Sequence, residues 1–130
     1  MSLTVDHLLD SIEENKIVAK ELFNSEHYSW SLFIWHLVVE KTIKAYLLNV
    51  NKEVPYIHDI KRLVFHSEVN FDELNLLDIE LDEITSFNLE ARYDDYKFEL
   101  YKKADKEYTT KWIDKCTSLH NFFLNKITNG

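Results

Sequence analysis

Glycine, proline and cysteine are almost absent from this chain of 130 residues, which contains one of each. The only glycine is the last residue, so the sequence has no glycine-rich loop of the kind that cradles phosphates. A lone cysteine, Cys116, has no second cysteine with which to form an internal disulfide. Because turn-forming residues are so rare and 45% of the residues are hydrophobic, we expect an all-α fold, an antiparallel up-and-down bundle of four or five helices. The length fits a single domain over residues 1–130.

An excess of positive charge is also missing. The formal net charge is −8, which disfavours broad electrostatic attraction to nucleic acid or to anionic lipid. Any contact with RNA or with a nucleotide must therefore be local. No charge-free apolar run reaches the length of about 18 residues that a membrane span needs, and no signal-peptide pattern opens the chain. We expect a soluble cytoplasmic protein that does not associate with a membrane.

Hydrophobic periodicity places the helices along the chain. Pro55 separates the second helix from the third, and Asn70 is a suitable N-cap for the fourth. Between residues 85 and 103 the pattern weakens, and we expect irregular structure there. The pattern predicts helices over residues 3–23, 30–50, 58–66, 71–84 and 104–127.

The segment 30–50 is apolar almost all round. Leu32, Trp35 and Ile43 fall on one stripe at 100° per residue, while Ile34 and Ala45 fall on the opposite side. A helix of this kind must be covered on two sides. We expect a second copy of the chain to cover one of them, which predicts a homodimer.

Three motifs follow one another in the chain. They are WHLVVEKTIKAYLL at residues 35–48, HDIKRL at residues 58–63 after Pro55, and EARYDDY at residues 90–96. In this order they resemble the HEPN domain family (higher eukaryotes and prokaryotes nucleotide-binding), whose pattern has an A-x-EK-x-x-KA-x-L helix, a P-x-x-HD-L turn and an ARYP loop. Asp94 stands in place of the proline of ARYP, and Ile57 in place of the threonine that often precedes the family's His-Asp.

The resemblance implies a HEPN-like helical bundle that forms a symmetric homodimer. It also implies one of two activities. The first is binding, either of a nucleotide or RNA phosphate or of a nucleotidyltransferase partner, in a toxin–antitoxin or defence system. The second is a metal-independent endoribonuclease.

The ribonuclease members of that family generally carry an arginine, four to six residues and then a histidine. This chain has two arginines. His66 follows Arg62 after only three residues, and no histidine lies within seven residues after Arg92. We therefore expect no catalytic residue of the family's kind and favour the binding module.

Each candidate binding residue has a second interpretation. Lys41 and Lys44 match the family's lysines and suit an anionic phosphate, but Glu40 and Lys44 are also spaced for an i, i+4 ion pair. His58 is either an imidazole oriented by the neighbouring carboxylate of Asp59 or the polar start of a helix.

The loop after residue 89 supplies the remaining candidates, Arg92 and Tyr93. Arg92 suits either a phosphate or an ion pair with a carboxylate such as Glu40 or Asp59. A ribonuclease with a displaced active site would use Arg92 as the phosphate clamp and His58 as the proton carrier. The six histidines show no metal-ligand spacing, so we expect neither a metal nor a cofactor.

Overall fold

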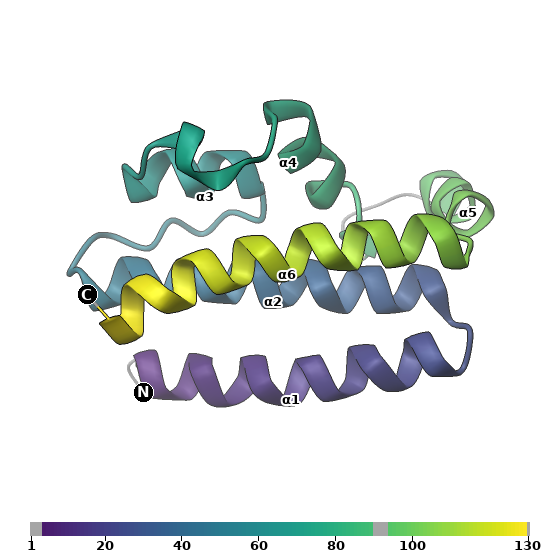
Figure 1. The fold of residues 1–130 in the computed structure, drawn as a ribbon, viewed down its shortest axis with the longest axis horizontal. Coiled ribbons are helices and arrows are strands. Elements are labelled where there is room, and N and C mark those ends of the chain that lie inside the picture. Colours follow the sequence, from purple (N-terminus) through teal and green to yellow (C-terminus); the bar gives the residue numbers. More distant parts are fainter. Residues whose placement is uncertain (1–3, 90–93, 130) are drawn as a thin grey trace.

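A computed structural model describes residues 4–89 and 94–129 of the chain (Figure 1). The described part is all-α, as predicted from the composition, and contains no strand. Three long helices lie side by side, the shorter ones cover one flank of this layer, and one short helix lies across its end (Figure 1). In chain order the elements are α1 (Val5–Asn24), α2 (Tyr28–Asn49), α3 (Ile60–Ser67), the 3-10 helix η1 (Phe71–Leu74), α4 (Asp78–Thr85), α5 (Asp94–Lys103) and α6 (Lys106–Asn129).

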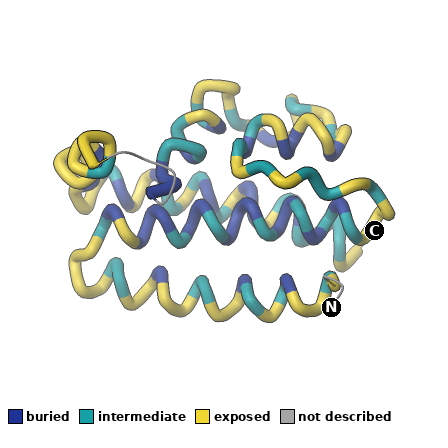
Figure 2. Tube along the Cα trace, turned by 180° about the vertical axis from the view of Figure 1, so that it is seen from behind, coloured by how far each residue is buried: buried dark blue, intermediate teal, exposed yellow. Residues whose placement is uncertain are grey.

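Helix α2 is the centre of the molecule. Its neighbours α1, α3, α5 and α6 all pack on it, and the buried residues concentrate along it (Figure 2). Val38 and Ala45 project from one side of the helix and Ile43 from another, and all three are completely buried. Helices α3 and α6 of the same chain therefore cover much of the second apolar side of α2, while Trp30 stays 50% exposed and Ile34 and Leu37 are only partly buried. The all-round apolar character of α2 does not by itself require a second copy, and the homodimer stays a prediction.

Two predicted segments differ from the structure. The single helix expected over residues 71–84 is divided into η1 and α4, because Asn75 between them has a left-handed backbone with φ of 56°. Asn70 does cap the first piece, since its side chain accepts a hydrogen bond from the backbone of Asp72. The irregular structure expected up to residue 103 is also wrong from residue 94 onward, where the chain forms α5.

The structure confirms the long closing helix that the regular spacing of apolar residues predicted, and this helix is α6. Trp112, Cys116, Leu119 and Phe123 are buried against α2 and its neighbours. No helix in residues 4–89 and 94–129 combines the length and the hydropathy needed to cross a bilayer.

Candidate functional site

A buried carboxylate on α2 is the centre of the candidate site. Only 8% of the Glu40 side chain is exposed. Its Oε1 accepts a hydrogen bond from His58 Nδ1 at 2.9 Å, and its Oε2 accepts one from Lys44 Nζ at 3.1 Å. An ionised carboxylate without partners would be strongly unfavourable at this depth, so the two donors make its burial possible. The predicted i, i+4 pair of Glu40 with Lys44 is confirmed.

His58 reaches Glu40 from the segment that joins α2 to α3, and a second histidine holds this segment in place. The Nε2 atom of His36, on α2, lies 3.2 Å from the backbone oxygen of His58. A carbonyl only accepts hydrogen bonds, so His36 carries its proton on Nε2. Burial lowers the pKa of His36, which keeps the ring neutral. The other nitrogen, Nδ1, has no hydrogen-bond partner among the described residues.

These contacts also fix the tautomer of His58. Because the ionised carboxylate of Glu40 can only accept, the proton of a neutral His58 ring is on Nδ1 and the lone pair is on Nε2. Half of the His58 side chain is exposed, so Nε2 is the atom that a ligand can reach. The ring of Tyr56, which is almost fully exposed, lies 6.1 Å from the His58 ring. We call Glu40, Lys44, His36 and His58 the Glu40 cluster.

Asp59 has a different role from the one that its place beside His58 suggests. Its Oδ1 accepts a hydrogen bond from the backbone nitrogen of Arg62 at 3.2 Å, which caps the N-terminus of α3. The helix-start interpretation is therefore confirmed for this pair of residues. Glu40, which is 18 residues away in the sequence, orients the imidazole instead of Asp59.

Lys41 lies apart from the Glu40 cluster. Its Nζ donates hydrogen bonds to Ser11 Oγ and Asn15 Oδ1 on α1, both at 2.8 Å. Partial burial lowers the pKa of Lys41. Lys41 and Lys44 thus donate to different partners, Lys41 to α1 and Lys44 to Glu40. That the two lysines hold one anion stays a prediction.

A groove along α3 adds residues that the sequence did not single out as a site. Arg62 is exposed there, and so is the ring of Phe65. The groove has a volume of about 620 Å³ and its walls combine positive charge with aromatic rings. Its lining residues are Lys61, Arg62, Phe65, His66, Phe71 and Asp78. The predicted site residues Arg92 and Tyr93 lie outside the described residues.

The described residues offer no other obvious reactive centre. Within residues 4–89 and 94–129, no three His, Cys, Asp or Glu side chains are grouped so that they could hold a metal ion. Cys116 is fully buried, and burial raises the pKa of its thiol. The thiolate, which is the nucleophilic form, is therefore disfavoured.

The fold and the site define a small all-α domain with a polar cluster on its central helix. The sequence model of the HEPN domain matches residues 5–127, nearly the whole chain, and the chain belongs to the HEPN domain family. Membership of this family supports a nucleotide-binding or RNA-related module in general terms. Neither the curated proteins nor the solved structures include a match to this chain.

Proposed function

We propose that this HEPN domain is a binding module for the phosphate groups of a nucleotide or of RNA. The observation that carries the proposal is the Glu40–His58 contact, which leaves Nε2 of a half-exposed imidazole available to a ligand. A protonated His58 donates a hydrogen bond from Nε2 to a phosphate oxygen while Nδ1 stays on Glu40. Both ring nitrogens of a protonated imidazole are donors, so the two hydrogen bonds can form together.

The groove along α3, a helix that begins two residues after His58, supplies the other contacts of the proposal. Arg62 presents five N–H donors in a fork that fits phosphate oxygens, and the exposed ring of Phe65 offers a face on which a base can stack. Lys44 is only 13% exposed, and its ammonium group donates to Glu40. It therefore contributes mainly by keeping the carboxylate in place. These few groups make a local site that the overall charge of −8 does not exclude.

From the resemblance of the three sequence motifs we also propose three finer features: a homodimer as the assembly, a nucleotidyltransferase as a protein partner, and a toxin–antitoxin or defence system as the setting.

Titration of the labelled protein with ATP and with a short single-stranded RNA, followed by amide chemical shifts, tests the phosphate site. We expect shifts at His58 and Arg62 and at least a tenfold loss of affinity in Arg62→Gln, because a charge-assisted hydrogen bond contributes roughly 1.5–3 kcal/mol. Lys106→Gln removes an equal charge at the far end of α6 and is the control. If neither ligand shifts these residues, the proposal fails.

The same contact favours a second candidate function, a metal-independent ribonuclease. A carboxylate-oriented imidazole is a suitable general base. In this scheme Nε2 of His58 takes the proton of the ribose 2′-hydroxyl, whose oxygen bonds to phosphorus. The 5′ oxygen leaves and receives that proton, giving a cyclic phosphate and a free 5′-hydroxyl. Arg92 is the proposed phosphate clamp.

Incubation of varied RNA substrates with the protein and a chelator tests this second candidate. Cleavage is expected to be lost in His58→Ala and slowed about 100-fold in Glu40→Gln, since the latter removes the charge that stabilises the imidazolium. RNA that the wild-type protein leaves intact excludes this activity but does not affect the binding proposal.

A further inference from the structure

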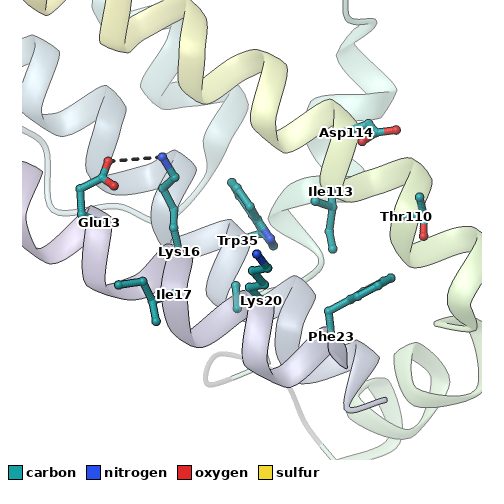
Figure 3. Close-up of a pocket in the computed structure, with 10 residues that line it drawn as sticks. Glu13, Lys16, Ile17, Lys20, Phe23, Trp35, Thr110, Ile113 and Asp114 are labelled. Carbon is teal, nitrogen blue, oxygen red and sulfur yellow. Dashed lines mark hydrogen bonds and ion pairs between the residues drawn. The ribbon is translucent and has the colours of Figure 1, made fainter. Parts of the chain in front are cut away.

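An apolar groove runs between α1 and α6 on a different face of the molecule from the Glu40 cluster. Trp35 of α2 forms part of its floor, Ile17 and Phe23 project from α1, and Ile113 projects from α6 (Figure 3). The groove has a volume of about 500 Å³. It shares no lining residue with the Glu40 cluster or with the groove along α3.

The groove exists because both outer helices pack mainly on α2 rather than on each other. Ser31 Oγ donates a hydrogen bond to the backbone oxygen of Ala19 at 2.8 Å, which holds α1 close to α2. On the other side Trp112 and Phe123 fix α6 against the core. The space between α1 and α6 is therefore left with apolar walls and no covering element from the described part of the chain.

The most exposed apolar side chain of α1 lies at this groove. Ile17 is 61% exposed, although a β-branched aliphatic side chain gains most when it is buried. The adjacent Val18 is also exposed. The surface therefore combines a projecting apolar side chain, Ile17, with an apolar groove that can accept such a side chain.

Charges around the groove form a self-complementary pattern. On α1, Glu13 lies before Ile17 and Lys20 lies after it, about one turn away in each direction. If two α1 helices cross antiparallel near Ile17, Glu13 of each copy lies opposite Lys20 of the other. Asp114 adds a second carboxylate on the α6 side of the groove. Glu13 Oε1 accepts a hydrogen bond from Lys16 of the same helix at 3.3 Å, but 65% of the Glu13 side chain is exposed, so its carboxylate stays accessible to a lysine of a second copy (Figure 3). Lys20 and Asp114 form no ion pair with another described residue.

We propose that the groove between α1 and α6 is the homodimer interface, with α1 of a second copy lying antiparallel in it. Ile17 of each copy fills the groove of the other, and the two Glu13–Lys20 pairs set the register. Because the same surface serves both copies, the contact is closed and two-fold symmetric. The inference rests on the proposed function only for the existence of a dimer. The proposed interface contains no residue of the Glu40 cluster, so His58 of each copy stays exposed.

Light scattering over a concentration series tests the location of this interface. Ile17→Glu is expected to weaken dimerisation at least about 100-fold, because it places a charge at the centre of an apolar contact. Ile79→Glu is the matched control, since Ile79 lies on α4 and is as exposed as Ile17 or more. Circular dichroism of both variants verifies that they fold.

A charge exchange tests the antiparallel register. Glu13→Lys and Lys20→Glu each place like charges opposite one another and should each weaken the dimer about tenfold, whereas the double variant should recover most of the affinity. A wild-type dimer that resists Ile17→Glu and both single exchanges overturns this interface but not the dimer of the proposed function. A chain that stays monomeric at every concentration overturns both the interface and the dimer. The phosphate-binding proposal is then still decided by the ATP and RNA titrations.

Discussion

At the scale of single residues, Glu40 determines the character of the site. One buried carboxylate holds Lys44 and His58, two side chains that would otherwise be free to turn away from α2. The neighbouring helices of the same chain cover α2, so the carboxylate of Glu40 is shielded from water. The polar residues on this helix are therefore part of the structure as well as part of the proposed binding surface.

Glu40→Gln is expected to destabilise the fold. The amide keeps the shape of the side chain but leaves the largely buried ammonium group of Lys44 without a counter-charge. The expected loss in the free energy of unfolding is roughly 3–5 kcal/mol, the range for removing one partner of a buried ion pair. Urea denaturation measures it, with the exposed Glu53 changed to Gln as the control. Equal midpoints for the two variants would contradict this role for Glu40.

His120 predicts a pH dependence of stability. Its Nδ1 lies 2.7 Å from Thr42 Oγ1 in the core, and burial lowers the pKa of His120 from 6.5 to about 4. The unfolded chain therefore binds more protons between these values, so the stabilising effect of the neutral ring is complete above pH 6.5 and is lost as the pH falls towards 4. The pKa of His36 is lowered by burial too, which adds a change of the same sign.

The variant His120→Gln isolates this effect. We expect the stability of the wild-type protein to fall by on the order of 1–3 kcal/mol more than that of the variant when the pH is lowered through this window. Urea unfolding of both proteins across the window measures the difference. Parallel pH profiles would show that His120 does not contribute.

At the scale of elements, the sequence predicted the three long helices and the short helix α3, but neither the formation of α5 nor the division of the next segment into η1 and α4. Helices α1, α2 and α6 each bury a long apolar surface, and their spacing is visible in the sequence. In α5 only Leu100 is buried, so its formation depends on local preference and on its position across the end of the bundle, and periodicity does not reveal it. The division between η1 and α4 depends on the backbone of one residue, Asn75.

The candidate site was predictable only where its contacts lie within one helix. The Glu40–Lys44 pair follows from helical spacing alone. The contact of Glu40 with His58 does not, because it depends on how the segment after α2 folds back over the helix. His36 lies within an apolar run, where nothing in the sequence distinguishes a structural polar residue from a core residue.

The N-cap of α3, Asp59, leads to a prediction about α3 and about His58, which directly precedes the cap. Asp59→Ala removes the hydrogen bond to the backbone of Arg62 and should lower the free energy of unfolding by about 1 kcal/mol. It should also weaken phosphate binding, because α3 and the preceding His58 lose a common anchor. Asp59→Asn keeps an acceptor oxygen and should retain most of both properties. Thermal unfolding and the ATP titration measure the two effects. If Asp59→Asn loses as much binding affinity as Asp59→Ala, the hydrogen bond of the cap does not position the site.

At the scale of the whole molecule, burial of Cys116 makes the thiol a reporter of unfolding. The side chain is completely buried, and its raised pKa disfavours the reactive thiolate. We expect an aromatic disulfide reagent to label it only as fast as the protein opens, with a rate that rises steeply with urea. Ser118→Cys, on an exposed position of the same helix, should be labelled at once at its new thiol. Rapid labelling of the wild-type protein in water would mean that α6 opens locally.

The central position of α2 has a consequence for how the chain is made. One of its two main neighbours, α1, precedes it and can pair with it as soon as both have left the ribosome. The other is α6, and the Thr42–His120 contact joins residues 78 positions apart. Until α6 has left the ribosome, the apolar side of α2 that α6 covers therefore stays in contact with water, and the nascent chain exposes a chaperone-binding surface that the folded domain has buried.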